Sequence, residues 1–102
     1  LTIRGNNVYP ASLEAILRAI DDVVEYRIEV RTEREMDHVR IEVEPAAGAD
    51  ADRLANEVGR QVKDRLNFQV DVVAVEPGAL PRFELKGRRL VRRGGEDGTN
   101  DG

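Results

Sequence analysis

Two short segments hold the residue types and spacing that are best suited to chemistry. The first is residues 4–10, Arg-Gly-Asn-Asn-Val-Tyr-Pro, and the second is residues 80–89, Leu-Pro-Arg-Phe-Glu-Leu-Lys-Gly-Arg-Arg. The ammonium of Lys86 in the second segment could stabilise negative charge that develops in a transition state. The sequence otherwise has no nucleophile elbow, no phosphate-binding glycine loop with a lysine and no histidine–carboxylate cluster, so a self-contained active site is not expected.

Composition excludes several classes of function. The formal net charge of -4 gives no overall basic field that would attract nucleic acid or an anionic membrane. The absence of cysteine and the single histidine exclude a disulfide framework and the usual zinc ligands, so no metal site is predicted. No apolar stretch approaches the roughly 20 residues that span a bilayer, and the N-terminus carries no export signal. The 102 residues are therefore predicted to form one cytoplasmic domain.

Hydrophobic periodicity predicts the elements that must position the two segments. Pro10 suits the first position of a helix, and Asp50 suits the N-cap of another. Apolar residues recur every three or four positions in two stretches, alternate in two others, and form a run of valines near the end. In chain order the predicted elements are a strand at 1–5, a helix at 10–20, a hairpin of strands 25–31 and 39–44, a helix at 51–66 and a strand at 70–75.

The order of these elements predicts an α+β fold, a ferredoxin-like β-α-β-β-α-β sandwich in which both helices cover one face of a small antiparallel or mixed sheet. The nearly continuous apolar run at 70–75, in which four of the six residues are valine, is typical of a strand buried on both faces, and predicts a central position in the sheet. Residues 87–93 form a basic extension, and the tail 94–102 is predicted to be disordered.

Alternation in the hairpin assigns its residues to two faces. The inward set is apolar and consists of Tyr26, Ile28, Val30, Val39, Ile41 and Val43. The outward set is charged and consists of Glu25, Arg27, Glu29, Arg31, Arg40, Glu42 and Glu44.

The two chemical segments together resemble a known family. Residues 4–10 are similar to the Arg-Gly-x-Asn segment, followed by an aromatic residue and a proline, that comes after the hinge in phenylacetate-CoA ligases and related acyl- and aryl-CoA synthetases. Residues 80–86 are similar to the Leu-Pro-Arg-(three residues)-Lys segment of these enzymes. The resemblance covers residues 1–93, with two departures: Phe83 is bulkier than usual, and Leu85 replaces a small residue.

This resemblance implies that residues 1–93 are the mobile C-terminal domain of an acid–CoA ligase. In this family an acid attacks the α-phosphate of ATP to give an acyl-adenylate and pyrophosphate, and the thiol of coenzyme A then displaces AMP. Lys86 takes the role of the lysine that is delivered for adenylate formation. Gly5, Asn6 and Asn7 would line the channel of the pantetheine arm in the second step, where a residue without Cβ lets the backbone pass close to the thiol.

The resemblance also implies partners. Arg4 would hold the orientation of the domain through a carboxylate of the large N-terminal domain, and Arg88 and Arg89 would contact coenzyme A or that domain. ATP and coenzyme A are co-substrates, Mg²⁺ belongs to the large domain, and the acid is expected to be aromatic. The fragment alone should bind no cofactor tightly and should be inactive. The start at Leu1, without a methionine, is expected of an excised piece.

Two other functions remain open at this point. The chain could be a stand-alone regulatory or small-ligand-binding α+β module that assembles as a dimer. It could also be a nucleic-acid adaptor that uses the basic residues Arg88, Arg89, Arg92 and Arg93. The adaptor ranks last because sheets that bind RNA usually carry stacking aromatic residues. His38 is predicted to be an exposed turn residue without a chemical role.

Overall fold

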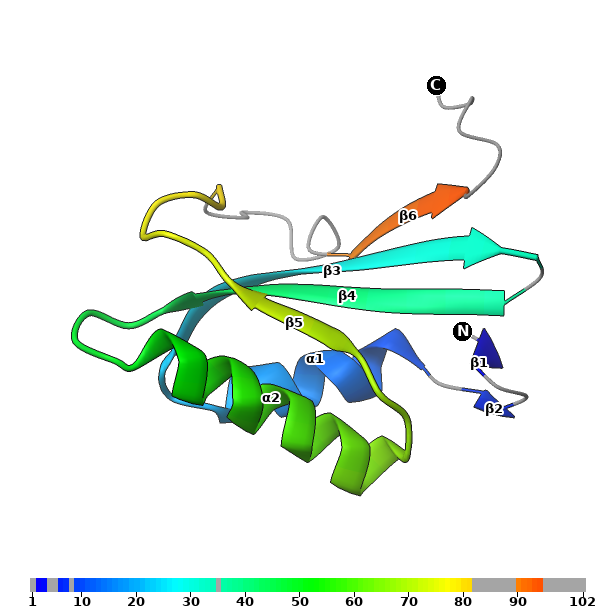
Figure 1. The fold of residues 1–102 in the computed structure, drawn as a ribbon, viewed down its shortest axis with the longest axis horizontal. Coiled ribbons are helices and arrows are strands. Elements are labelled where there is room, and N and C mark those ends of the chain that lie inside the picture. Colours follow the sequence, from blue (N-terminus) through cyan, green and yellow to red (C-terminus); the bar gives the residue numbers. More distant parts are fainter. Residues whose placement is uncertain (1, 4–5, 8, 35, 82–89, 95–102) are drawn as a thin grey trace.

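The computed structural model of the chain describes residues 2–3, 6–7, 9–34, 36–81 and 90–94 (Figure 1). The elements in chain order are β1 (Thr2–Ile3), β2 (Asn6–Asn7), α1 (Pro10–Ala19), β3 (Val23–Glu33), β4 (Met36–Pro45), α2 (Ala51–Leu66), β5 (Asp71–Ala74) and β6 (Leu90–Gly94). Four strands form one mixed sheet in the order β5-β4-β3-β6, and β1 pairs with β2 in a separate two-stranded sheet. Both helices cover the same face of the larger sheet, which confirms the predicted α+β class (Figure 1).

The inner face of the β3–β4 hairpin is the centre of the core. The antiparallel register places buried apolar residues opposite one another, Tyr26 with Val43, Ile28 with Ile41 and Val30 with Val39. Full burial of such side chains stabilises a fold by about 1.5–3 kcal/mol each. The predicted inward set of the hairpin is therefore confirmed.

Helix α1 follows directly after the first chemical segment. Pro10 occupies its first turn, where the missing N–H would have had no partner within the helix. Leu13 and Leu17 are fully buried against the sheet. The Tyr26 hydroxyl on β3 donates a hydrogen bond to Oε1 of Glu14, at 2.8 Å, which ties the helix to the sheet.

Helix α2 has polar caps at both ends. Asp50 is the N-cap, as predicted, and its side chain accepts a hydrogen bond from the N–H of Arg53 at 3.2 Å. Asn67 adopts a left-handed φ of 62° at the C-cap and donates its N–H to the carbonyl of Lys63. The residues that α2 buries in the core are Leu54, Val58 and Val62.

The prediction that the valine run is a central strand is wrong. Strand β5 lies at one edge of the sheet, parallel to β4, because α2 carries the chain back along the hairpin. The helices therefore cover only one face of β5: Val72 packs partly against the core, whereas Val73 is 38% exposed. On the other side of the hairpin, β6 runs parallel to β3, so the basic extension supplies the fourth strand.

Gly59 lies inside α2, where glycine costs helix stability. A Cβ atom built at Gly59 would lie 3.9 Å from Cγ2 of Val72, an ordinary contact distance. We therefore expect Gly59→Ala to raise the free energy of unfolding by about 0.5–1 kcal/mol in urea titrations.

The matched control for Gly59→Ala is Gly78→Ala. An added Cβ at Gly78 would meet no atom within 4 Å, but this glycine has a φ of 82°. The second substitution should lower the free energy of unfolding, because residues with a Cβ are strained at positive φ. A loss of stability in Gly59→Ala would contradict the packing of α2 on β5.

Candidate functional site

The first chemical segment lies at the N-terminal hairpin. Asn6 and Asn7 form β2, and their backbones pair with Ile3 and Thr2. The small hairpin lies beside β4 (Figure 1). Arg4 and Gly5 lie outside the described residues. The segment thus enters the fold next to β4 and leaves it through α1.

The second chemical segment begins at placed residues, and a placed strand follows it. Gly78 has a positive φ, and the N–H of Ala79 bonds to the carbonyl of Glu76 at 3.0 Å, which forms a turn. Leu80 follows with 3% of its surface exposed. Lys86, Arg88 and Arg89 lie outside the described residues. The chain is placed again at Leu90, which pairs with Ile28 of β3.

The placed ends of the two segments attach to different parts of the sheet. The first segment lies beside β4, and the strand that follows the second segment, β6, pairs with β3 on the side away from β4. Among the described residues, the structure does not bring the two segments into one cleft.

A charged network that the sequence did not predict covers the sheet face opposite the helices. Glu42 accepts hydrogen bonds from Arg27 at 2.7 Å and from Arg40 at 3.0 Å. Arg40 also approaches Glu29 at 3.9 Å. The register explains the network, because Arg27 lies opposite Glu42, and Glu29 lies opposite Arg40. The alternating charges of the two strands would have signalled these pairs once the register was known.

Several acidic residues of the outward set are buried instead of exposed. Glu25 is 4% exposed, Glu42 9% and Glu44 3%, and Glu25 lies directly opposite Glu44. Oε1 of Glu25 accepts a hydrogen bond from the N–H of Tyr26 at 3.1 Å. Alternation correctly assigned these residues to the face away from the helices, but that face is not simply open to solvent.

The pKa of Glu42 reflects opposing effects. Burial raises the pKa of this carboxyl, but the hydrogen bond and the positive charge of Arg27, together with those of Arg40, outweigh burial. The net result is a pKa below the ordinary value of 4.5. Glu42 is therefore ionised across the neutral range and holds both arginines in place.

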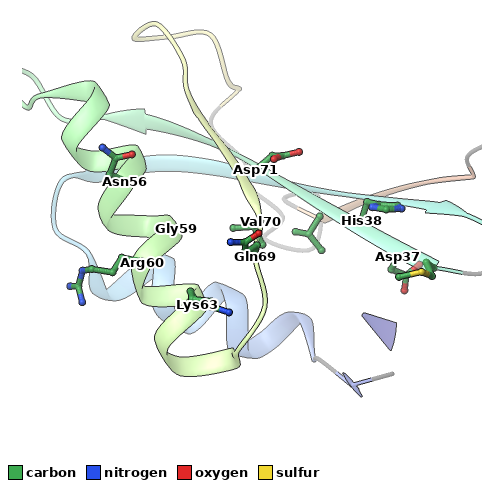
Figure 2. A pocket seen from close by; sticks show the side chains of 11 residues that line it. Asp37, His38, Asn56, Gly59, Arg60, Lys63, Gln69, Val70 and Asp71 are labelled. Carbon is green, nitrogen blue, oxygen red and sulfur yellow. The ribbon is translucent and has the colours of Figure 1, made fainter. Parts of the chain in front are cut away.

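A hollow of about 690 Å³ lies between α2, the start of β4 and the segment that leads into β5 (Figure 2). Its polar lining includes His38, Asn56, Lys63 and Gln69. His38 is exposed, as predicted, but it lies in β4, opposite Arg31, and not in a turn. Of the residues that the structure describes in the two chemical segments, none lines this hollow, so it is separate from the placed ends of both.

The described residues hold neither a candidate metal site nor a membrane-spanning helix. Within the placed ranges, no group of three His, Cys, Asp or Glu residues is arranged to hold a metal ion. None of the helices in the same ranges is long and apolar enough to cross a membrane.

Comparison with known sequences gives a consistent result. The profile of the AMP-binding enzyme C-terminal domain matches residues 5–93. A phenylacetate-coenzyme A ligase from Thermus thermophilus is 34% identical over 103 residues, which cover 82% of this chain. The match covers 23% of that ligase, so the chain spans about a quarter of the length of this curated relative.

Solved structures with the same fold agree with the sequence matches. A domain of phenylacetate-coenzyme A ligase from Bacteroides vulgatus gives a TM-score of 0.72 at 28% identity, covering 92% of both chains. A 2-hydroxyisobutyryl-CoA ligase, in complex with 2-HIB-AMP and CoA in the thioesterification state, gives a TM-score of 0.76 at 30% identity. The match covers 92% of this chain and 21% of the ligase chain. The same ligase in a postadenylation state with R3-HIB-AMP gives a TM-score of 0.77 at 30% identity. This match covers 90% of this chain and 21% of the ligase chain.

The lowered pKa of Glu42 predicts how stability depends on pH. A carboxyl whose pKa is lower in the folded state contributes stability above its unfolded pKa, and this contribution is lost as the pH falls through the folded pKa. We expect Glu42→Gln to lose stability relative to the wild type at pH 7, and this difference to shrink as the pH falls below 4.5. Urea titrations at several pH values measure the difference in the free energy of unfolding between the two proteins.

Glu33→Gln is the matched control for Glu42→Gln, because Glu33 is an exposed residue at the end of β3. Its difference from the wild type should be small at every pH. An equal, pH-independent effect of both substitutions would contradict the role of the Arg27–Glu42–Arg40 network.

Proposed function

The chain belongs to the AMP-binding enzyme C-terminal domain family, and we propose that it is the small mobile domain of an ATP-dependent acid–CoA ligase. The observation that carries this proposal is a relative of the same fold, 2-hydroxyisobutyryl-CoA ligase, solved in a postadenylation state and in a thioesterification state. A ligase with two half-reactions needs different groups beside the reacting atoms in each. A small domain that reorients can supply them in turn.

In the first half-reaction, Lys86 is the delivered group. A carboxylate oxygen of the acid attacks the α-phosphorus of ATP, the bond to the pyrophosphate oxygen breaks, and acyl-adenylate and pyrophosphate form. Negative charge grows on the phosphoryl oxygens during this step, and an ammonium placed there stabilises the transition state more than the ground state. A lysine on a flexible four-carbon stem can enter and leave the cleft as the domain moves.

In the second half-reaction, the segment around Gly5 faces the large domain. The sulfur of coenzyme A attacks the acyl carbon, the thiol proton is lost, and AMP leaves with the oxygen. We assign Gly5, Asn6 and Asn7 to the wall of the pantetheine channel. The pairing of β2 with β1 supports this assignment, because it fixes the backbones of Asn6 and Asn7 next to the glycine. A residue without Cβ leaves room for the thiol arm.

The remaining assignments concern partners. Arg4 would orient the domain against the large N-terminal domain, and Arg88 and Arg89 would contact either that domain or the phosphates of coenzyme A. ATP and coenzyme A are the proposed co-substrates, Mg²⁺ stays assigned to the large domain, and an aromatic carboxylic acid is the proposed substrate class. The cytoplasm stays the predicted location, and inactivity of the isolated fragment stays a prediction.

Replacement of Lys86 tests the first role in the full-length ligase. We expect Lys86→Ala to reduce acid-dependent pyrophosphate release by about 10²–10³-fold, the usual cost of a lost electrostatic catalyst. Thioester formation from preformed acyl-adenylate should survive. Lys63→Ala is the matched control, because Lys63 and Lys86 are the two lysines of the chain and Lys63 lies on α2. If both half-reactions keep their rates in Lys86→Ala, the regulatory-module alternative is favoured instead.

Replacement of Gly5 tests the second role in the same enzyme. We expect Gly5→Val to slow thioester formation from preformed acyl-adenylate, because a branched side chain would obstruct the pantetheine channel, and to leave pyrophosphate release near the wild-type rate. The two half-reactions are measured separately for each variant. Equal losses in both would indicate a folding defect, and no loss in either would remove Gly5 from the channel.

A further inference from the structure

The outer edge of β5 offers backbone hydrogen-bonding groups to a further strand. The N–H of Val75 bonds to the carbonyl of Val43 on β4 at 2.8 Å. In a parallel ladder alternate residues bond to the same neighbour, so the backbone groups of Val72 and Ala74 point away from β4. Among the described strands, none pairs with this edge. An edge of this kind is a template for an added strand.

The hollow described above lies beside this edge. Gly59 on α2 and Val70 before β5 contribute to its lining, and the neighbouring hollow continues past Ala55 to Val73. A Cβ atom at Gly59 would meet only the side chain of Val72, at 3.9 Å. The small residues of α2 therefore leave space along β5 where alternate side chains of an added strand could fit.

Three exposed side chains in the hollow have unused hydrogen-bonding capacity. Within the described part of the chain, the side chains of Asn56, Lys63 and Gln69 take part in no hydrogen bond or ion pair. Figure 2 shows Lys63 reaching from α2 toward the segment that leads into β5, whereas Arg60 points away. Arg60 is already paired with Glu57 at 2.7 Å and with Asp64 at 3.0 Å.

The acidic residues at the hollow do not neutralise Lys63. Asp37 accepts a hydrogen bond from Thr32 at 2.6 Å on the hairpin. Asp71 pairs in register with Arg40, on the sheet face away from the helices. Within the described residues Lys63 takes part in no ion pair, so its ammonium favours an acidic group on whatever binds in the hollow.

We propose that the outer edge of β5 and the hollow beside α2 form a docking groove for an extended strand of a partner protein, with an acidic side chain opposite Lys63. In this mode the backbone groups of Val72 and Ala74 provide affinity, and Lys63, Asn56 and Gln69 select the side chains. The proposal does not depend on the ligase function.

A capped heptapeptide of alternating valine and glutamate is the probe. Titrated into the ¹⁵N-labelled 102-residue chain, it should shift the amide resonances of residues 70–74 and of α2 around Gly59. The same peptide with its alternate amides N-methylated should not bind, because it cannot complete the ladder. Binding without this difference would overturn strand addition.

Charge reversal on α2 tests the acidic contact. Lys63→Glu should weaken binding of the glutamate peptide by about tenfold or more, the cost of a lost charge-assisted contact, and should favour a peptide with lysine in place of glutamate. Arg65→Glu makes the same change of charge at an exposed residue of α2 outside the hollow and should leave both affinities unchanged. Equal effects of the two variants would overturn the role of Lys63.

Two further outcomes would also contradict the proposal. Absence of shifts up to the solubility limit of the glutamate peptide would exclude the groove as a strand site. Concentration-dependent shifts of residues 70–74 without peptide would indicate a second copy as the occupant.

Substitutions of Gly59 test the space in the groove. Gly59→Ala should retain peptide binding because its Cβ fits, whereas the larger side chain of Gly59→Leu should block the groove. Both variants should keep the cooperative unfolding of the wild type.

Discussion

The apolar inner face of the β3–β4 hairpin is the constraint on which the rest of the structure depends. Its apolar side chains stabilise the fold only if other elements shield them from water, and α1 and α2 together provide that cover. With both helices on one face, the other face carries the Arg27–Glu42–Arg40 network. The hairpin also fixes where the outer strands can pair, β5 beside β4 and β6 beside β3.

This arrangement determines how the two chemical segments are held. The first segment is placed by β1 and α1, and α1 is tied to the hairpin by the bond between Tyr26 and Glu14. The second is held between the buried Leu80 and the pairing of Leu90 with Ile28. Both segments are therefore attached to the same hairpin, at different places along it. The reorientation proposed for this domain requires that both segments move with the hairpin.

Local patterns in the sequence predicted the elements but not all of their neighbours. The helix at 51–66 and the inward set of the hairpin follow from periodicity and from the Asp50 cap, which depend on nearby residues. The edge position of β5 depends on a parallel pairing across α2, and the place of β6 depends on a pairing with distant residues of β3. The valines of this strand do not by themselves indicate whether one face or both faces of the strand are covered. The network at Glu42 likewise required the register.

The candidate site was predictable only through resemblance. Composition and spacing left Lys86 as one lysine in a charged stretch, and the motif around it supplied the role. The family match at residues 5–93 supports the motif, while Lys86 and Gly5 lie outside the described residues, so their roles stay predictions. The groove beside β5 had no sequence signal, because it depends on the edge position of that strand and on the open space over Gly59.

The most direct test of the central claim is acid-dependent exchange of labelled pyrophosphate into ATP by the full-length protein with residues 1–93 removed. The account predicts that the truncated enzyme loses exchange, that the added 102-residue chain restores part of it, and that the Lys86→Ala chain restores none. Exchange at the full rate without this domain would contradict the claim that it delivers a group for adenylate formation.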